Sequence, residues 1–141
     1  MTGQVRATFA ALVLAQTAHS TEEYFGRLWE ALLPARVVSR VFSSSPQLGF
    51  LIANVLIVAF GVWCAAWPVN RGWRGARALA WGWIVVEVAN GVLHPLVALV
   101  FQRYIAGVFT APVLLVVALR LAYLLGASRP ERGMETARGA R

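Results

Sequence analysis

Long runs of apolar residues, separated by short polar segments, dominate the chain. No charged side chain occurs between Arg40 and Arg71, and the apolar centre of that stretch predicts a helix over 47–67. Two further apolar stretches predict helices over 78–101 and 105–126. Each of these three segments is long enough to span a lipid bilayer, so we expect all three to be transmembrane helices.

The N-terminal segment has a less regular pattern. Its first uncharged stretch, Ala7 to Ala18, is too short to span a bilayer, so a cleaved signal peptide is one interpretation. However, no clean cleavage site of small residues follows this stretch, and apolar residues resume between Tyr24 and Leu33. We therefore expect one long helix from Ala7 to Leu33 with polar residues at mid-depth.

These four helices predict an all-α fold, a four-helix transmembrane bundle over residues 1–126 with a polar site at mid-membrane depth. The first connection, Pro34 to Pro46, contains arginines and valines at spacings that favour a short helix lying in the membrane interface. Residues 127–141 are expected to form a disordered polar tail.

The composition supports a membrane protein. Hydrophobic residues make up 59% of the chain and charged residues 13%, whereas soluble domains contain about 25% charged residues. The mean hydropathy is +0.64. The net charge is +7, but the arginines flank apolar segments and form no single basic face, so we expect no nucleic-acid binding.

The arginines also predict the orientation in the membrane. All of the basic residues are arginines, and they are more numerous on the side that holds both termini than on the other side. Positively charged residues collect on the cytoplasmic side of membrane proteins. We therefore expect both termini to lie in the cytoplasm.

Two groups of polar residues interrupt the apolar helices. The first group shares one face of the first helix and comprises His19, Glu22 and Glu23. The second group forms a stripe on the third helix and comprises Glu87, Asn90 and His94. Ionisable side chains inside a bilayer are costly unless they are paired or hydrated, and they mark functional sites by default. The two groups overlap in depth, so we expect them to form one site.

These side chains can bind a metal ion. A catalytic zinc site takes three protein ligands and leaves one position open, and we expect His19, Glu23 and His94 to be the ligands. Glu22 or Glu87 would then transfer protons. We favour zinc over iron, because a di-iron site in a helix bundle takes more carboxylates than these stripes supply.

Metal-free alternatives use the same residues. A carboxyl group in an apolar site can act as an acid near neutral pH while a histidine acts as a base. Polar side chains can also hold helices together, or carry ions and protons. Asn90 would orient a ligand or a carboxylate in either case. Arg120 either extends to the cytoplasmic interface or pairs with Glu87.

The segment His19-Ser20-Thr21-Glu22-Glu23 resembles the motif that names the HXXEE domain family of small bacterial membrane proteins. The resemblance extends to the stripe over 87–94. It also includes 103–111, which is similar to the family's Tyr-x-Pro-Gly-x-x-Thr-Ala segment, with Ala106 in place of the proline. The resemblance implies that both polar groups and Tyr104 belong to one site, and that the protein lies in the bacterial cytoplasmic membrane. No reaction is established for the family.

Two hypotheses from different classes follow. In the first, the protein is a membrane-embedded enzyme, metal-dependent or acid–base, that hydrolyses or modifies a lipid or another apolar substrate. In the second, it is a non-catalytic membrane protein: a lipid or small-molecule binder, a transporter or an assembly subunit. Membrane lipids are the expected partners in both, and a homodimer is compatible with both.

Overall fold

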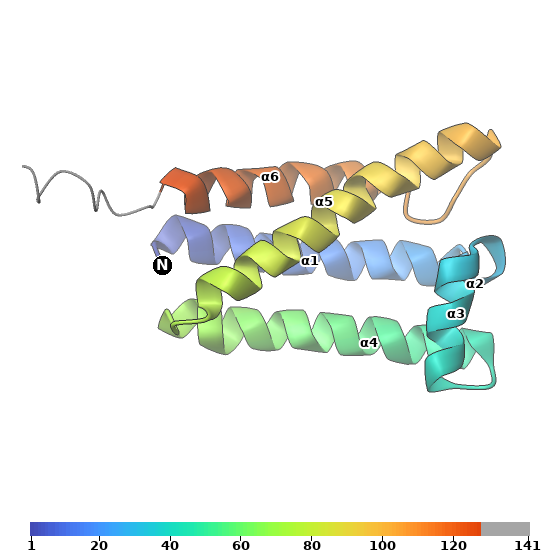
Figure 1. Cartoon of the computed structure of the whole chain (residues 1–141), viewed down its shortest axis with the longest axis horizontal. Helices are drawn as coiled ribbons and strands as arrows, with labels where there is room; N and C mark the ends of the chain where they lie inside the picture. Colours follow the sequence, from blue (N-terminus) through green and yellow to red (C-terminus); the bar gives the residue numbers. More distant parts are fainter. Residues whose placement is uncertain (128–141) are drawn as a thin grey trace, which may run out of the picture.

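The computed structural model describes residues 1–127, which form helices and no strand. Four long helices run side by side, with α5 inclined to the other three (Figure 1). The long helices are α1 (Gly3–Phe25), α4 (Pro46–Cys64), α5 (Ala76–Phe101) and α6 (Ala111–Ala127). The short helices are α2 (Leu28–Ala31), α3 (Leu33–Phe42) and the π-helix η1 (Ala65–Val69). The predicted all-α fold is confirmed.

Among residues 1–127, two helical stretches are long and apolar enough to cross a membrane, judged by length and composition alone. They are Pro46–Val69, which joins α4 to η1, and Ala76–Phe101, which is α5. The helix α6 is apolar but has only 17 residues. Of the four transmembrane helices expected from the sequence, two are therefore candidate spans, which suggest membrane association only weakly, and the four-helix transmembrane bundle is not confirmed.

The prediction of a single helix from Ala7 to Leu33 is wrong. The helix α1 ends at Phe25, and the backbone of Arg27 is left-handed, with a φ angle of 55°. The chain turns there and continues as α2 and then α3. Pro34 lies in the first turn of α3, where its missing N–H leaves no helical hydrogen bond unmade. The motif residues consequently lie near the C-terminal end of α1.

The start of the fourth helix also differs from the prediction. It begins at Ala111 and not at 105, because residues 102–110 form a connection that is bonded to α1. Two residues of this connection have positive φ angles, Gln102 at 50° and Gly107 at 98°. Of the predicted tail, only Ala127 lies within the described residues, as the last residue of α6.

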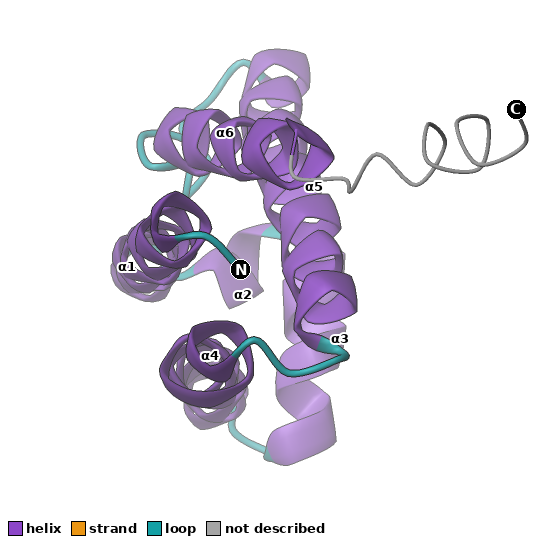
Figure 2. Cartoon of the chain, turned by 90° about the vertical axis from the view of Figure 1, so that its left-hand side faces the viewer, coloured by secondary structure: helices purple, strands orange, loops and turns teal. Residues whose placement is uncertain are grey.

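Apolar side chains hold α1, α5 and α6 together. Seen along the bundle, α6 lies next to both α1 and α5 (Figure 2). Buried residues of the largest core include Phe9, Leu12, Leu114, Ala118 and Leu121. Gly91 lets α5 approach α6 closely, because a Cβ at this position would lie 2.7 Å from the Cβ of Leu115. This packing holds α5, and with it His94, in a defined position.

Candidate metal centre

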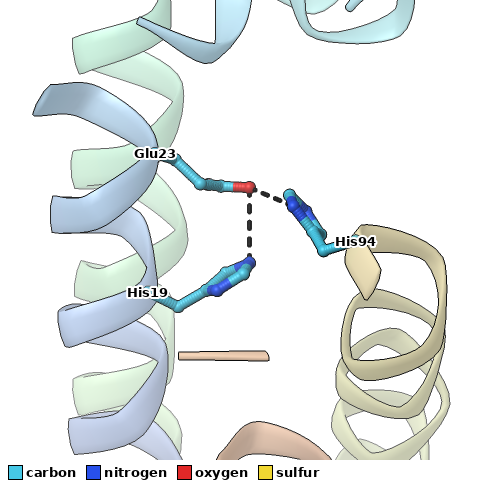
Figure 3. A group of neighbouring side chains, drawn as sticks. All are labelled: His19, Glu23 and His94. Atoms are coloured by element: carbon cyan, nitrogen blue, oxygen red, sulfur yellow. Dashed lines mark ion pairs between the residues drawn. The ribbon is translucent and has the colours of Figure 1, made fainter. Parts of the chain in front are cut away.

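Three ionisable side chains from two helices meet toward the C-terminal ends of α1 and α5. His19 and Glu23 come from successive turns of α1, and His94 comes from α5 (Figure 3). The Oε1 atom of Glu23 lies 3.4 Å from Nε2 of His19 and 3.2 Å from Nε2 of His94. One ligand atom from each residue lies within 4.8 Å of the others. We call these three residues the His–Glu cluster.

The cluster is enclosed by protein. His19 has no exposed surface, and His94 is 7% exposed. The two imidazole rings are nearly perpendicular, at 84°, with their centroids 4.7 Å apart. Both rings therefore present an edge to the single carboxylate of Glu23.

The remaining acidic residue of the motif, Glu22, fastens the 102–110 connection to α1. Its Oε1 accepts hydrogen bonds from the Tyr104 hydroxyl at 2.9 Å and the Phe109 N–H at 3.2 Å. Its Oε2 accepts from the N–H of Thr110 at 2.9 Å and from the hydroxyl of the same residue at 2.6 Å. A carboxylate has about four acceptor sites, so these four donors occupy it fully.

Hydrogen bonds to the connection determine which nitrogen of each histidine carries the proton. Nδ1 of His94 lies 2.7 Å from the carbonyl oxygen of Ala106, which can only accept, so Nδ1 donates. Nδ1 of His19 lies 2.8 Å from Oγ1 of Thr110. The hydroxyl proton of Thr110 goes to the carboxylate of Glu22, so its oxygen accepts from Nδ1 of His19. In neutral imidazoles, both Nε2 atoms then carry lone pairs.

This arrangement leaves the cluster without a donor of its own. Two Nε2 lone pairs face a carboxylate that can only accept, and such groups repel one another. Nε2 of His19 is buried and has no hydrogen-bond partner, and a buried polar atom without a partner is costly. Either a cation or added protons must occupy the space between the three side chains.

Gly107 makes this close arrangement of the two rings sterically feasible. A Cβ at Gly107 would lie 2.6 Å from Nδ1 of His94 and 2.7 Å from Cε1 of His19. Its φ angle of 98° is also one that residues with side chains rarely adopt. Glycine is therefore required here for both the backbone conformation and the space beside the histidines.

A second buried carboxylate, Glu87, belongs to a separate hydrogen-bond network. It has no exposed surface, and Nδ2 of Asn90 lies 3.4 Å from its Oε2. The amide nitrogen of Gln16, when turned toward Glu87, lies 2.8 Å and 3.1 Å from its two oxygens. In this orientation the amide oxygen of Gln16 accepts a hydrogen bond from Ser20 at 3.0 Å. The polar stripe of α5 thus contacts α1 at two levels, the His–Glu cluster and this network.

The other two predicted site residues lie outside the cluster. The Tyr104 side chain is 52% exposed. Partial burial of its hydroxyl, together with the hydrogen bond to Glu22 and the negative charge of that carboxylate, raises the pKa of Tyr104. Its phenol therefore stays protonated and donates at neutral pH. Arg120 is exposed on α6 and makes no ion pair with Glu87 in the part of the chain that the structure describes.

Several residues that shape the cluster were not identified from their positions in the chain. They are Gln16, Ala106, Gly107 and Thr110. Gln16 precedes His19 by one turn of α1, so its position on the polar face could have indicated it. The others lie in the 103–111 segment that resembles the family, but nothing in their spacing shows that they bond to the histidines.

The fold and the cluster define a helical protein with a His–Glu site between two helices, held by a connection that a second glutamate binds. The chain belongs to the family described as proteins of unknown function with the HXXEE motif, whose family model matches residues 10–121. No curated protein and no solved structure matches the chain significantly. In this chain, the first and last residues of the motif build the His–Glu cluster, and Glu22 holds the connection.

Proposed function

We propose that this protein is a membrane-embedded metalloenzyme that binds one zinc ion through His19, Glu23 and His94. The observation that carries the proposal is the buried Nε2 of His19, which has no hydrogen-bond partner and in a neutral ring would offer a lone pair to a metal ion. The distances from Oε1 of Glu23 to Nε2 of His19 and of His94, 3.4 Å and 3.2 Å, also suit a tetrahedral ion. Neighbouring ligands of such an ion are about 3.3 Å apart when its bonds are about 2.0–2.1 Å long.

The hydrogen bonds that fix the two rings support the same proposal. A histidine that binds a metal ion through one nitrogen usually donates its other N–H to a carbonyl, a carboxylate or a water molecule. His94 donates to the carbonyl of Ala106, and His19 donates to a hydroxyl that is itself bonded to Glu22. Both rings are therefore held with Nε2 directed at the shared centre before any ion binds.

We place the bundle across a membrane, with both termini on the cytoplasmic side. The candidate spans Pro46–Val69 and Ala76–Phe101 support this placement, as does the larger number of arginines on the side of the termini. The His–Glu cluster then lies below the opposite surface, because His19 and Glu23 precede the end of α1 by less than two turns. This position is nearer to the membrane surface than the mid-membrane depth expected from the sequence, because α1 ends at Phe25 and not at Leu33. We therefore propose that the substrate is a lipid ester or a similar apolar molecule that reaches the site from that surface.

The chemistry expected of such a site is hydrolysis. A zinc ion held by His19, Glu23 and His94 would supply an activated water molecule for hydrolysis. A base would be needed to accept a proton from that water. Glu22 is fully occupied by the 102–110 connection, so we assign proton transfer to Glu87. Asn90 orients the Glu87 carboxylate through its side-chain amide.

The first test is the metal content of protein purified without a histidine tag. After exposure to Zn²⁺ and removal of free metal, elemental analysis is expected to find about one zinc per chain. Glu23→Gln should lower this content to background, because it replaces one of the three ligands. Glu30→Gln is the matched control, since Glu30 is exposed and pairs with Arg27. The proposal fails if the wild type stays empty when Zn²⁺, Fe²⁺ and Mn²⁺ are each offered.

Thr110→Val is expected to weaken zinc binding without removing a ligand. The substitution keeps the shape of the side chain but removes the hydroxyl that accepts from Nδ1 of His19. Loss of such a supporting hydrogen bond typically lowers metal affinity about 10–100-fold. Competition with a chelator of known affinity measures the change. Thr21→Val, which removes an exposed hydroxyl bonded only to the backbone of α1, should have no effect. Equal affinities in the two variants would disprove this role of Thr110.

A metal-free function is the second candidate. Both separations from Glu23 to the histidine nitrogens are within ion-pair range, so protonated rings can also pair with this carboxylate. The cluster would then act as an acid–base pair or as a link between helices. Nitrogen NMR of labelled histidines separates the two cases. Neutral rings that shift on adding zinc support the metal centre, and protonated rings that do not respond to zinc support the pair.

A further inference from the structure

The helix α3 lies across the ends of α1 and α4, roughly perpendicular to both (Figure 1). Its arginines, Arg36 and Arg40, lie on one side of the helix. Its large apolar side chains are exposed on the surface of the structure. They are Leu33, Val37, Val38, Val41 and Phe42. A helix that has charged residues on one face and apolar residues on the other lies flat in a membrane interface, with its apolar face among the acyl chains. The placement of the bundle proposed above puts α3 at that depth.

Beside α3 is a charged pocket of about 450 Å³. Three arginines and one glutamate line it, Arg27, Arg36, Arg40 and Glu30, so it carries a net positive charge. The positive end of the α4 dipole adds to this charge, because Ser45 and Pro46, at the start of α4, also line the pocket.

The arginines differ in how they are bonded. Arg27 pairs with Glu30 at 2.5 Å, and Arg36 donates to the backbone carbonyls of Trp29 and Glu30. The guanidinium of Arg40 makes no hydrogen bond or ion pair within residues 1–127. Its guanidinium is therefore free to bind an anion in the pocket.

An apolar groove of about 410 Å³ lies between α1 and α4, next to the charged pocket. Its lining includes Tyr24, Leu51, Val55 and Val58. Nε2 of Gln47, a residue of the charged pocket, donates to the hydroxyl of Tyr24 at 3.2 Å. This hydrogen bond marks the boundary between the two cavities. From Gln47 to Val58, α4 rises about 16 Å along the bundle.

We infer that one anionic phospholipid binds here, with its phosphate in the charged pocket and an acyl chain in the apolar groove. A free phosphate would use only the pocket, and a neutral lipid would use only the groove. An anionic lipid uses both, and its charge complements the unpaired guanidinium of Arg40. The inference rests on the proposed membrane placement but not on the metal centre, which lies on the side of α1 that faces α5.

The test compares lipid binding by native mass spectrometry of the full chain in detergent. Wild type should retain phosphatidylglycerol in preference to phosphatidylcholine with the same acyl chains. An arginine near a membrane surface contributes about 1 kcal/mol to the binding of anionic lipids. Arg40→Gln should therefore reduce this preference about fivefold. Arg103→Gln is the matched control, because Arg103 is exposed but lies over the ring of Phe101 and outside the pocket.

Two further arms separate a lipid from a free anion. Val55→Trp should fill the groove and weaken phosphatidylglycerol binding, and inorganic phosphate should not displace the lipid. Equal retention of the two lipids by wild type, or equal losses in Arg40→Gln and Arg103→Gln, would overturn the inference. Efficient displacement of the lipid by phosphate would overturn it as well. Zinc content is measured on the same samples, so a failure of the metal centre and a failure of the lipid site can be told apart.

Discussion

Gly107→Ala is expected to weaken zinc binding by more than about 100-fold. Loss of one hydrogen bond to a metal-binding histidine typically lowers affinity about 10–100-fold, and this substitution displaces two of the three ligands. The new methyl group would lie within 2.7 Å of atoms in both His19 and His94. Neither ring can move away easily, because each donates from Nδ1 to the 102–110 connection.

Backbone strain must be separated from this steric effect. Gly72→Ala provides the control, since Gly72 also has a positive φ angle, 65°, but only the terminal nitrogen of Met1 lies near its Cβ position, at 3.8 Å. Both variants should lose stability, and only Gly107→Ala should lose zinc. Titration against a chelator measures affinity, and thermal unfolding in detergent measures stability. Full zinc affinity in Gly107→Ala would show that the histidines do not form the metal centre.

Glu22→Ala is expected to lower the free energy of unfolding by about 3 kcal/mol. Each hydrogen bond to a charged group contributes about 1.5–3 kcal/mol when it is well shielded. Glu22 accepts four such bonds. The side chain is only partly buried, so water replaces a share of them, and the total is well below the sum. A loss of about 3 kcal/mol corresponds to a fall in the unfolding temperature of roughly 10 °C.

Glu22→Ala should also affect the proposed metal centre. Without Glu22, the hydroxyl of Thr110 has no carboxylate to which it can donate, so it no longer has to accept from His19. Zinc affinity should therefore fall in Glu22→Ala, and Glu22→Gln should be intermediate because an amide oxygen still accepts. Glu30→Ala is the control for loss of a carboxylate, since its ion pair with Arg27 is exposed and contributes little. An unchanged unfolding temperature in Glu22→Ala would show that Glu22 does not hold the 102–110 connection against α1.

Much of the helical organisation could be predicted because it depends on local pattern. The candidate spans Pro46–Val69 and Ala76–Phe101 agree closely with the segments expected from apolar runs. The end of α1 could not be predicted in the same way. Apolar residues continue beyond Gly26, and the left-handed backbone of Arg27 depends on how α2 and α3 pack against the bundle.

The candidate site, too, could be predicted only in part from the sequence. Helical spacing alone places His19 and Glu23 on one face, and it places His94 on one stripe with Glu87. The prediction that they form one site required a further assumption about depth, and the structure brings the three proposed ligand residues together. The sequence assigned Glu23 as a ligand and Glu22 as a candidate for proton transfer, but it did not predict that Glu22 binds the 102–110 connection. That contact forms only when distant segments of the folded chain meet.

The sequence by itself determined which side chains are available for chemistry and on which helix faces they lie, because both follow from residue type and from the period of the helix. Only the tertiary structure decided which groups each of them contacts. The 102–110 connection folds back onto α1, and its hydrogen bonds to Glu22 place Gly107 beside the two imidazole rings. Its oxygen atoms on Ala106 and Thr110 then orient both rings toward Glu23. These contacts join residues more than eighty positions apart in the case of α1, and no local pattern encodes such pairings.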